Sequence, residues 1–100
     1  MSEFKVRIPK RKIEAFCKRY QVQRLALFGS VVRDDFHRES DIDGLVVFDP
    51  NARVTFMTLG RMKRDLSGIF QRPVDVVPQE GLKSSIRQAI LASAQEIYAA

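Results

Sequence analysis

Two aspartates lie where both could bind one divalent cation. Asp41 and Asp43 are two residues apart at the start of the segment Asp-Ile-Asp-Gly-Leu-Val-Val-Phe, whose β-branched residues predict a strand over 41–48. Side chains at positions i and i+2 of a strand leave the same face of the sheet, so the two carboxylates are expected to point to one site. Oxygen ligands with no His or Cys nearby favour Mg²⁺ or Mn²⁺ over zinc.

Asp75 is the third candidate ligand. It lies in the valine-rich segment 74–77 between two prolines, which predicts another short, buried strand. A carboxylate on such a strand needs a partner, and a neighbouring strand that carries Asp41 and Asp43 would supply a shared metal. Three carboxylates on adjacent strands are typical of sites that hold two metal ions for in-line displacement at phosphorus.

A second pattern suits a phosphate. The apolar run Leu25–Phe28 predicts a buried strand that ends at Gly29, and Ser30 is placed to cap a short helix reaching about Asp34. Glycine lets a phosphate approach the backbone, while a helix N-terminus and a serine hydroxyl offer it hydrogen-bond donors. Arg33, one turn further, is expected to reach the same anion. A phosphate site ten residues before an acid pair predicts a nucleoside triphosphate as ligand.

Each of these features alone also fits a structural role. An isolated Asp-x-Asp is more often a solvated strand edge or a turn than a metal site. Gly29 and Ser30 alone describe an ordinary turn from a strand into a capped helix, and Arg33 could pair with neighbouring acids on the surface. The functional interpretation therefore depends on the combination.

Three longer helices complete the predicted elements. One begins at Pro9 and places apolar residues at helical spacing: Ile13, Phe16, Cys17 and Tyr20. A second spans 55–70, and a third spans 84–98 with Ile86, Ile90, Ala94 and Ile97 on one face. Only about a dozen residues join the first two strands, too few for a parallel crossover, so an antiparallel pair in a mixed sheet is expected.

Length and composition limit the protein class. The chain has 100 residues with 45% hydrophobic content, which predicts a single α/β domain over 1–100. No apolar run approaches the roughly 20 residues of a membrane span, and residues 1–12 lack the apolar stretch of a signal peptide, so a cytoplasmic protein is expected. Cys17 is the only cysteine and excludes an internal disulfide.

The net charge of +5 is unevenly distributed. Residues 1–24 carry a net +6, whereas residues 25–100 carry a net −1, with six acids crowded between Asp34 and Asp49. An acidic focus of this kind suits a cation better than a nucleic-acid backbone. An RNA-binding module is supported only by the basic first helix, because the sequence shows neither a recognition motif nor an aromatic platform. Nucleic acid is therefore not the expected partner.

The combined pattern resembles the minimal nucleotidyltransferases of the DNA polymerase β superfamily. The matching segments are Leu27-Phe28-Gly29-Ser30-Val31-Val32-Arg33, Ser40-Asp41-Ile42-Asp43, Val74-Asp75-Val76-Val77 and a C-terminal helix ending in Glu96-Ile97-Tyr98. The resemblance implies an α/β fold in which helices pack against a short mixed sheet. It also implies Mg²⁺-dependent transfer of a nucleoside monophosphate, most simply AMP from ATP, to a hydroxyl group.

The resemblance assigns roles to the candidate residues. Asp41 and Asp43 would hold the metal ions, Asp75 would complete the site and act as base, and Gly29 and Ser30 would bind the β- and γ-phosphates. Two positions depart from the family pattern: Asp34 stands where a glycine is usual, and Gly44 stands where a large apolar residue is common.

The resemblance also implies a partner. Family members of this length are similar to antitoxins encoded beside a helical HEPN ribonuclease, and some adenylylate a tyrosine of that toxin. The alternative belongs to another class: a binding module that neutralises the toxin by contact and keeps a slow or inactive nucleotide site.

Overall fold

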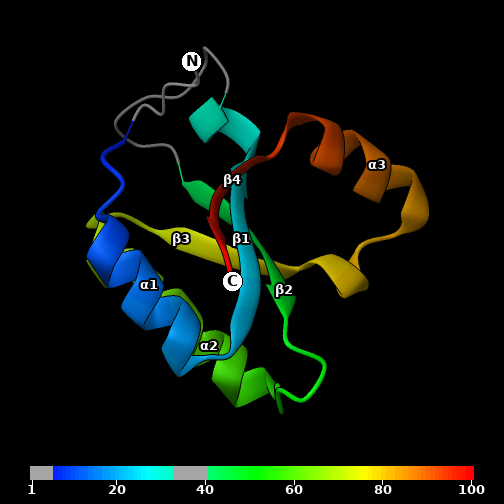
Figure 1. Cartoon of the computed structure of the whole chain (residues 1–100). Coiled ribbons are helices and arrows are strands. Elements are labelled where there is room, and N and C mark those ends of the chain that lie inside the picture. The colour runs from blue at the N-terminus through cyan, green and yellow to red at the C-terminus, as the bar shows by residue number, and fades with distance from the viewer. Residues whose placement is uncertain (1–5, 33–40) are drawn as a thin grey trace.

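A four-stranded mixed sheet forms the centre of the molecule in the computed structural model, which describes residues 6–32 and 41–100 (Figure 1). The strands, in the order β3-β2-β1-β4 across the sheet, are β3 (Val74–Pro78), β2 (Ile42–Phe48), β1 (Val22–Phe28) and β4 (Gln95–Ala99). Strand β1 is antiparallel to β2 and to β4, whereas β2 is parallel to β3. The antiparallel pairing predicted for the first two strands is confirmed.

Helices α1 (Lys10–Arg19) and α2 (Phe56–Phe70) lie together against the sheet (Figure 1). The apolar stripe predicted for α1 is confirmed, since Ile13, Phe16 and Cys17 are all buried. Met62 and Leu66 of α2 join the same core. The rest of it comes from the apolar sides of β1, β2 and β3 and from the turn after β1, with Val22, Leu25, Leu27, Val31, Ile42, Val46 and Val74.

Both ends of α2 are fixed by specific contacts. At the start, Thr55 and Thr58 form a capping box in which each side-chain oxygen accepts a hydrogen bond from the other residue's backbone N–H, both at 3.2 Å. At the end, Gln71 adopts the left-handed conformation, and the backbone N–H of Val74 donates to Ser67 Oγ at 3.0 Å. This last bond ties the helix to the start of β3, so α2 is held beside that strand.

The C-terminal helix is shorter than the predicted span of 84–98. Helix α3 covers only Ser84–Ser93, and the chain then becomes extended at Ala94 and continues as β4. The predicted helical segment ending at Tyr98 is therefore wrong: residues 95–99 pair with β1, whose second edge a longer helix would leave unpaired. A cross-strand ion pair, Arg24 Nε to Glu96 Oε1 at 2.7 Å, joins β1 to β4.

The residues predicted to form one apolar face of this helix do not lie together. Helix α3 stands apart from α1 and α2 (Figure 1) and contains no buried residue, with Ile86 49% exposed. Ile97 instead packs against the core from β4.

Two single-turn 3₁₀ helices, η1 (Gly29–Val32) and η2 (Gln79–Gly81), follow β1 and β3. The helix that Ser30 was expected to cap is thus a 3₁₀ turn that already includes Ser30, and Asp34 lies outside the described residues. Gly44 lies inside β2 without interrupting it. None of the helices described is both long enough and apolar enough to cross a membrane.

Gly29 makes the turn out of β1 possible. Its φ of +79° lies in the left-handed region, and an added Cβ would come 2.3 Å from Asp43 Oδ2. At Gly44, by contrast, the nearest atom to an added Cβ would be the Asp75 backbone oxygen at 3.5 Å, an ordinary contact. The carboxylate of Asp43 therefore packs against a backbone that has no side chain.

Gly29→Ala is expected to lower the free energy of unfolding by at least about 1–2 kcal/mol, since an L-residue is strained in this conformation and its methyl group would displace Asp43. Gly44→Ala is the matched control and should leave stability unchanged or raise it by about 0.5–1 kcal/mol, because glycine is disfavoured inside a strand. Urea unfolding followed by circular dichroism measures both. Equal stabilities for the two variants would contradict the close packing at Gly29.

Cys17 is fully buried in α1, as its apolar spacing predicted. Burial raises the pKa of the Cys17 thiol from 9.0 to about 12, because the thiolate is poorly solvated in the core. The unfolded chain therefore loses this proton at a lower pH than the folded protein does. The stability that the buried neutral thiol contributes is complete below pH 9 and is lost as the pH rises toward 12.

Accordingly, iodoacetamide at pH 8 should label Cys17 in urea but scarcely in the native state. Between pH 9 and pH 12 the free energy of unfolding should fall more steeply for wild type than for Cys17→Ala. The difference between the two slopes isolates the thiol from the tyrosines that titrate in the same range. Rapid native labelling would show that Cys17 is not enclosed.

Candidate functional site

Asp43 and Asp75 lie side by side on neighbouring strands. They are Cα partners in the parallel pair of β2 and β3, and Asp43 is also opposite Phe28 at the end of β1. Partners in adjacent strands project from the same face of a sheet. The alternate residues of β2, Ile42 and Gly44, are buried on the other face, so the two carboxylates leave the sheet on the side opposite the core.

The predicted phosphate turn is next to this acid pair. Gly29 directly follows Phe28, and its backbone lies against the Asp43 carboxylate, as the hypothetical Cβ contact shows. Ser30 follows in η1 and is half-buried. Three of the predicted site residues, Gly29, Asp43 and Asp75, are thus brought together across the ends of three strands.

Asp41 lies at the edge of this arrangement. It is exposed and directly precedes β2, whose first N–H, from Ile42, donates to the Pro73 carbonyl at 3.0 Å. Among residues 6–32 and 41–100, no three His, Cys, Asp or Glu side chains are gathered closely enough to hold a metal ion. Arg33 lies outside the described residues, so its predicted place beside the phosphates stays a prediction.

Lys63 is a site residue that sequence reasoning missed. Its Nζ lies 3.2 Å from Asp75 Oδ1, with the two side chains 57% and 51% exposed. An ion pair this exposed contributes about 0–1 kcal/mol to stability, so its main effect is to fix the Asp75 carboxylate. The sequence did indicate that Asp75 needs a partner. It did not indicate that Lys63, twelve positions earlier on a helix, would be that partner.

A groove of about 420 Å³ opens beside the acid pair, between α2 and β3. We call it the α2–β3 groove. Its polar lining is Asp43, Asp75 and Lys63, and its remaining lining is Phe56, Leu59, Gly60, Val76 and Val77. Phe56, in the first turn of α2, is 92% exposed. The groove therefore combines carboxylates with an apolar wall.

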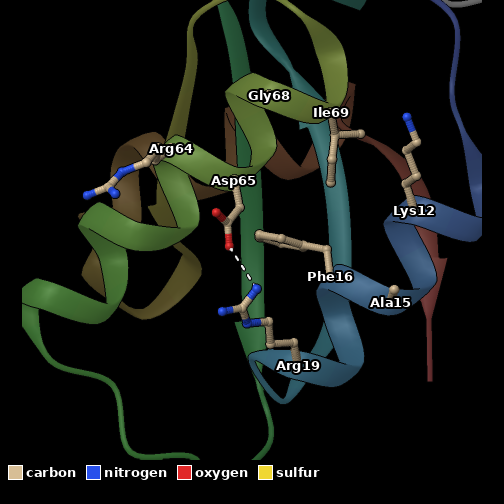
Figure 2. A pocket seen from close by; sticks show the side chains of 8 residues that line it. All are labelled: Lys12, Ala15, Phe16, Arg19, Arg64, Asp65, Gly68 and Ile69. Atoms are coloured by element: carbon tan, nitrogen blue, oxygen red, sulfur yellow. Dashed lines mark ion pairs between the residues drawn. The ribbon is translucent and has the colours of Figure 1, made fainter.

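A second groove of about 450 Å³ lies between α1 and α2 (Figure 2). Its only carboxylate, Asp65, is engaged by Arg19 at 3.7 Å and accepts a hydrogen bond from the Tyr20 hydroxyl. Burial, followed by this hydrogen bond, raises the pKa of Tyr20. Figure 2 shows Arg19 reaching from α1 toward Asp65, whereas Arg64 on α2 points away from it. This groove therefore presents one carboxylate among three basic side chains, whereas the α2–β3 groove presents two carboxylates and one lysine.

Sequence comparison identifies the family. The nucleotidyltransferase domain family matches residues 9–97 of the chain. A Methanocaldococcus jannaschii protein named "Putative protein adenylyltransferase MJ0435" is 31% identical over 88 residues, which cover 88% of this chain and 92% of that protein.

Solved structures share the fold. A toxin–antitoxin structure with AMP-PNP superimposes with a TM-score of 0.76 at 20% identity, covering 93% of this chain and 75% of the other. The complex of tri-AMPylated Shewanella oneidensis HEPN toxin with MNT antitoxin gives a TM-score of 0.66 at 18% identity, covering 91% and 70% of the two chains. The glycine turn beside Asp43, the paired aspartates on adjacent strands and the match along nearly the whole chain agree: this chain belongs to the nucleotidyltransferase domain family and is a minimal nucleotidyltransferase.

Proposed function

We propose that this nucleotidyltransferase transfers AMP from ATP to a tyrosine hydroxyl of a HEPN toxin and so acts as an antitoxin in the cytoplasm. The main structural support is the line of Gly29, Asp43 and Asp75 across β1, β2 and β3. The turn at Gly29, which we propose binds phosphate, is adjacent to Asp43, and Asp43 pairs with Asp75 on the next strand. The AMP-PNP and AMPylated-toxin structures that share the fold favour adenine as the base and a toxin as the acceptor.

The donor set fits Mg²⁺ or Mn²⁺. Asp43 and Asp75 offer carboxylate oxygens from adjacent strands, and Asp41 offers another from two residues before Asp43. Hard divalent cations prefer such oxygen ligands. When bound, the metal supplies positive charge that neutralises the triphosphate.

The remaining chemistry belongs to the chain itself. Gly29 presents backbone without a side chain, and its N–H and the Ser30 hydroxyl are proposed to bind the β- and γ-phosphates, with Arg33 on the same anion. Asp75 is proposed to accept the proton of the incoming hydroxyl. The hydroxyl oxygen then bonds to the α-phosphorus, and pyrophosphate departs with the electron pair of the broken P–O bond.

The acceptor is proposed to come from a second protein because the domain is small. The described residues form four strands and three α-helices, and the Asp75 side chain stays 51% exposed. A partner surface would complete the site. In the alternative function, the protein would bind the toxin at the same surface and inhibit it by contact, without transferring AMP.

A metal-dependent change in melting temperature tests the ligands. Adding Mg²⁺ with ATP should raise the melting temperature, since a ligand that binds only the native state stabilises it. Asp41→Asn combined with Asp43→Asn should abolish that rise, although removing clustered negative charge can itself stabilise the metal-free protein. Differential scanning fluorimetry measures both effects. An unchanged response in the double variant would show that these aspartates are not the ligands.

Transfer itself distinguishes an enzyme from a binding module. The protein is incubated with its HEPN partner, Mg²⁺ and each of the four ribonucleoside triphosphates, and the partner is analysed by mass spectrometry. Wild type with ATP should add AMP to a tyrosine, whereas Asp75→Asn should lower the rate at least about 100-fold, the lower range for a lost general base, while still binding the partner. Silencing of the toxin without any adduct would establish inhibition by contact instead.

A further inference from the structure

The α2–β3 groove and the phosphate turn lie on opposite sides of Asp43. Gly29 meets Asp43 from the β1 side, whereas Asp75, Lys63 and the rest of the groove lie on its β3 side. The β1 side and the β3 side of Asp43 therefore present different chemical groups. A ligand atom held near Asp43 would have the turn on one flank and the groove on the other.

The geometry of phosphoryl transfer limits the direction from which the acceptor hydroxyl can approach. The attacking and leaving oxygens lie roughly in line on opposite sides of the phosphorus. Under the proposed function, the leaving pyrophosphate is held at Gly29 and Ser30. The incoming hydroxyl must therefore approach from the flank of Asp75, where the α2–β3 groove opens.

We propose that the α2–β3 groove is the acceptor site, and that it holds the aromatic ring of a partner tyrosine against Phe56 with its hydroxyl at Asp75. The proposal rests on the proposed function and specifies where the acceptor binds. Phe56, Leu59 and Val77 provide an apolar wall, and Asp43 and Asp75 provide carboxylates in the same groove. This combination matches a phenol, which is an apolar ring carrying one hydroxyl.

Two details of the lining support this occupant. Phe56 exposes 92% of its surface to solvent, and burial against another ring would remove apolar area from water. Lys63 Nζ lies 3.2 Å from Asp75 Oδ1, so it can orient the carboxylate that is proposed to receive the phenol proton. The groove volume of about 420 Å³ is within the range of small-molecule sites.

The proposed step is balanced within the site. The tyrosine oxygen forms a bond to the α-phosphorus of ATP, and the bond from that phosphorus to the bridging oxygen breaks. The phenol proton passes to the Asp75 carboxylate, and pyrophosphate leaves with the bonding electrons. Lys63 is a positioning residue in this scheme because it contacts Asp75 rather than the reacting atoms.

A matched pair of glycine variants tests the groove. Gly60 lines the α2–β3 groove and Gly68 lies on the same helix but lines the α1–α2 groove; an added Cβ meets nothing within 4 Å at either position. Gly60→Phe therefore fills the proposed acceptor site, and Gly68→Phe controls for the same change elsewhere on α2. The assay measures AMP transfer to the HEPN partner and the KM for ATP and for the partner separately.

Gly60→Phe should lower kcat/KM for the partner at least tenfold and leave the KM for ATP within twofold of wild type. Gly68→Phe should leave both values within twofold. A loss of ATP binding in Gly60→Phe would place the nucleotide base in the groove and overturn the proposal, as would unimpaired transfer. Absence of transfer by wild type would instead overturn the proposed function, and the acceptor site with it.

Phe56→Ala and Met57→Ala provide a second test that does not depend on filling the groove. These neighbours are 92% and 70% exposed, so neither truncation removes core packing. Phe56→Ala should raise the KM for the partner at least fivefold with kcat little changed, whereas Met57→Ala, which does not line the groove, should not. Equal effects of the two truncations would contradict the ring contact.

Discussion

Strand β2 is hydrogen-bonded on both sides, antiparallel to β1 and parallel to β3, and this register determines both the core and the site. Ile42 and Val46 enter the core while Asp43 leaves the opposite face. Because side chains alternate along a strand, a slip by one residue would exchange the two sets. The apolar residues that stabilise the sheet therefore also fix Asp43 between Gly29 and Asp75.

Local patterns were sufficient to predict most of this arrangement. The apolar spacing of α1, the β-branched run of β2 and the short link between the first two strands each have a direct physical meaning, and each prediction is confirmed. The turn predicted at Gly29 is also confirmed, and its positive φ explains why glycine occupies that position.

What the sequence could not show depends on contacts distant along the chain. Ile97 and Tyr98 fit a helical spacing with Ile90, yet they belong to β4 because β1 has an open edge there. Such an open edge exists only in the assembled sheet, so the sequence of residues 95–99 contains no local pattern that indicates it. Lys63 was missed for the same reason: only the docking of α2 beside β3 places its ammonium on Asp75.

Pairing of β4 with β1 has a consequence for synthesis of the protein. Leu27 meets Gln95 in the sheet, so β1 is translated long before the strand that covers its second edge. At 5–20 residues per second, the interval is roughly 3–14 s. During that time β1 exposes unpaired backbone flanked by Leu25 and Leu27, a surface on which another nascent chain can add a strand. Completion of the sheet by β4 then covers this edge and removes the surface on which such pairing could occur.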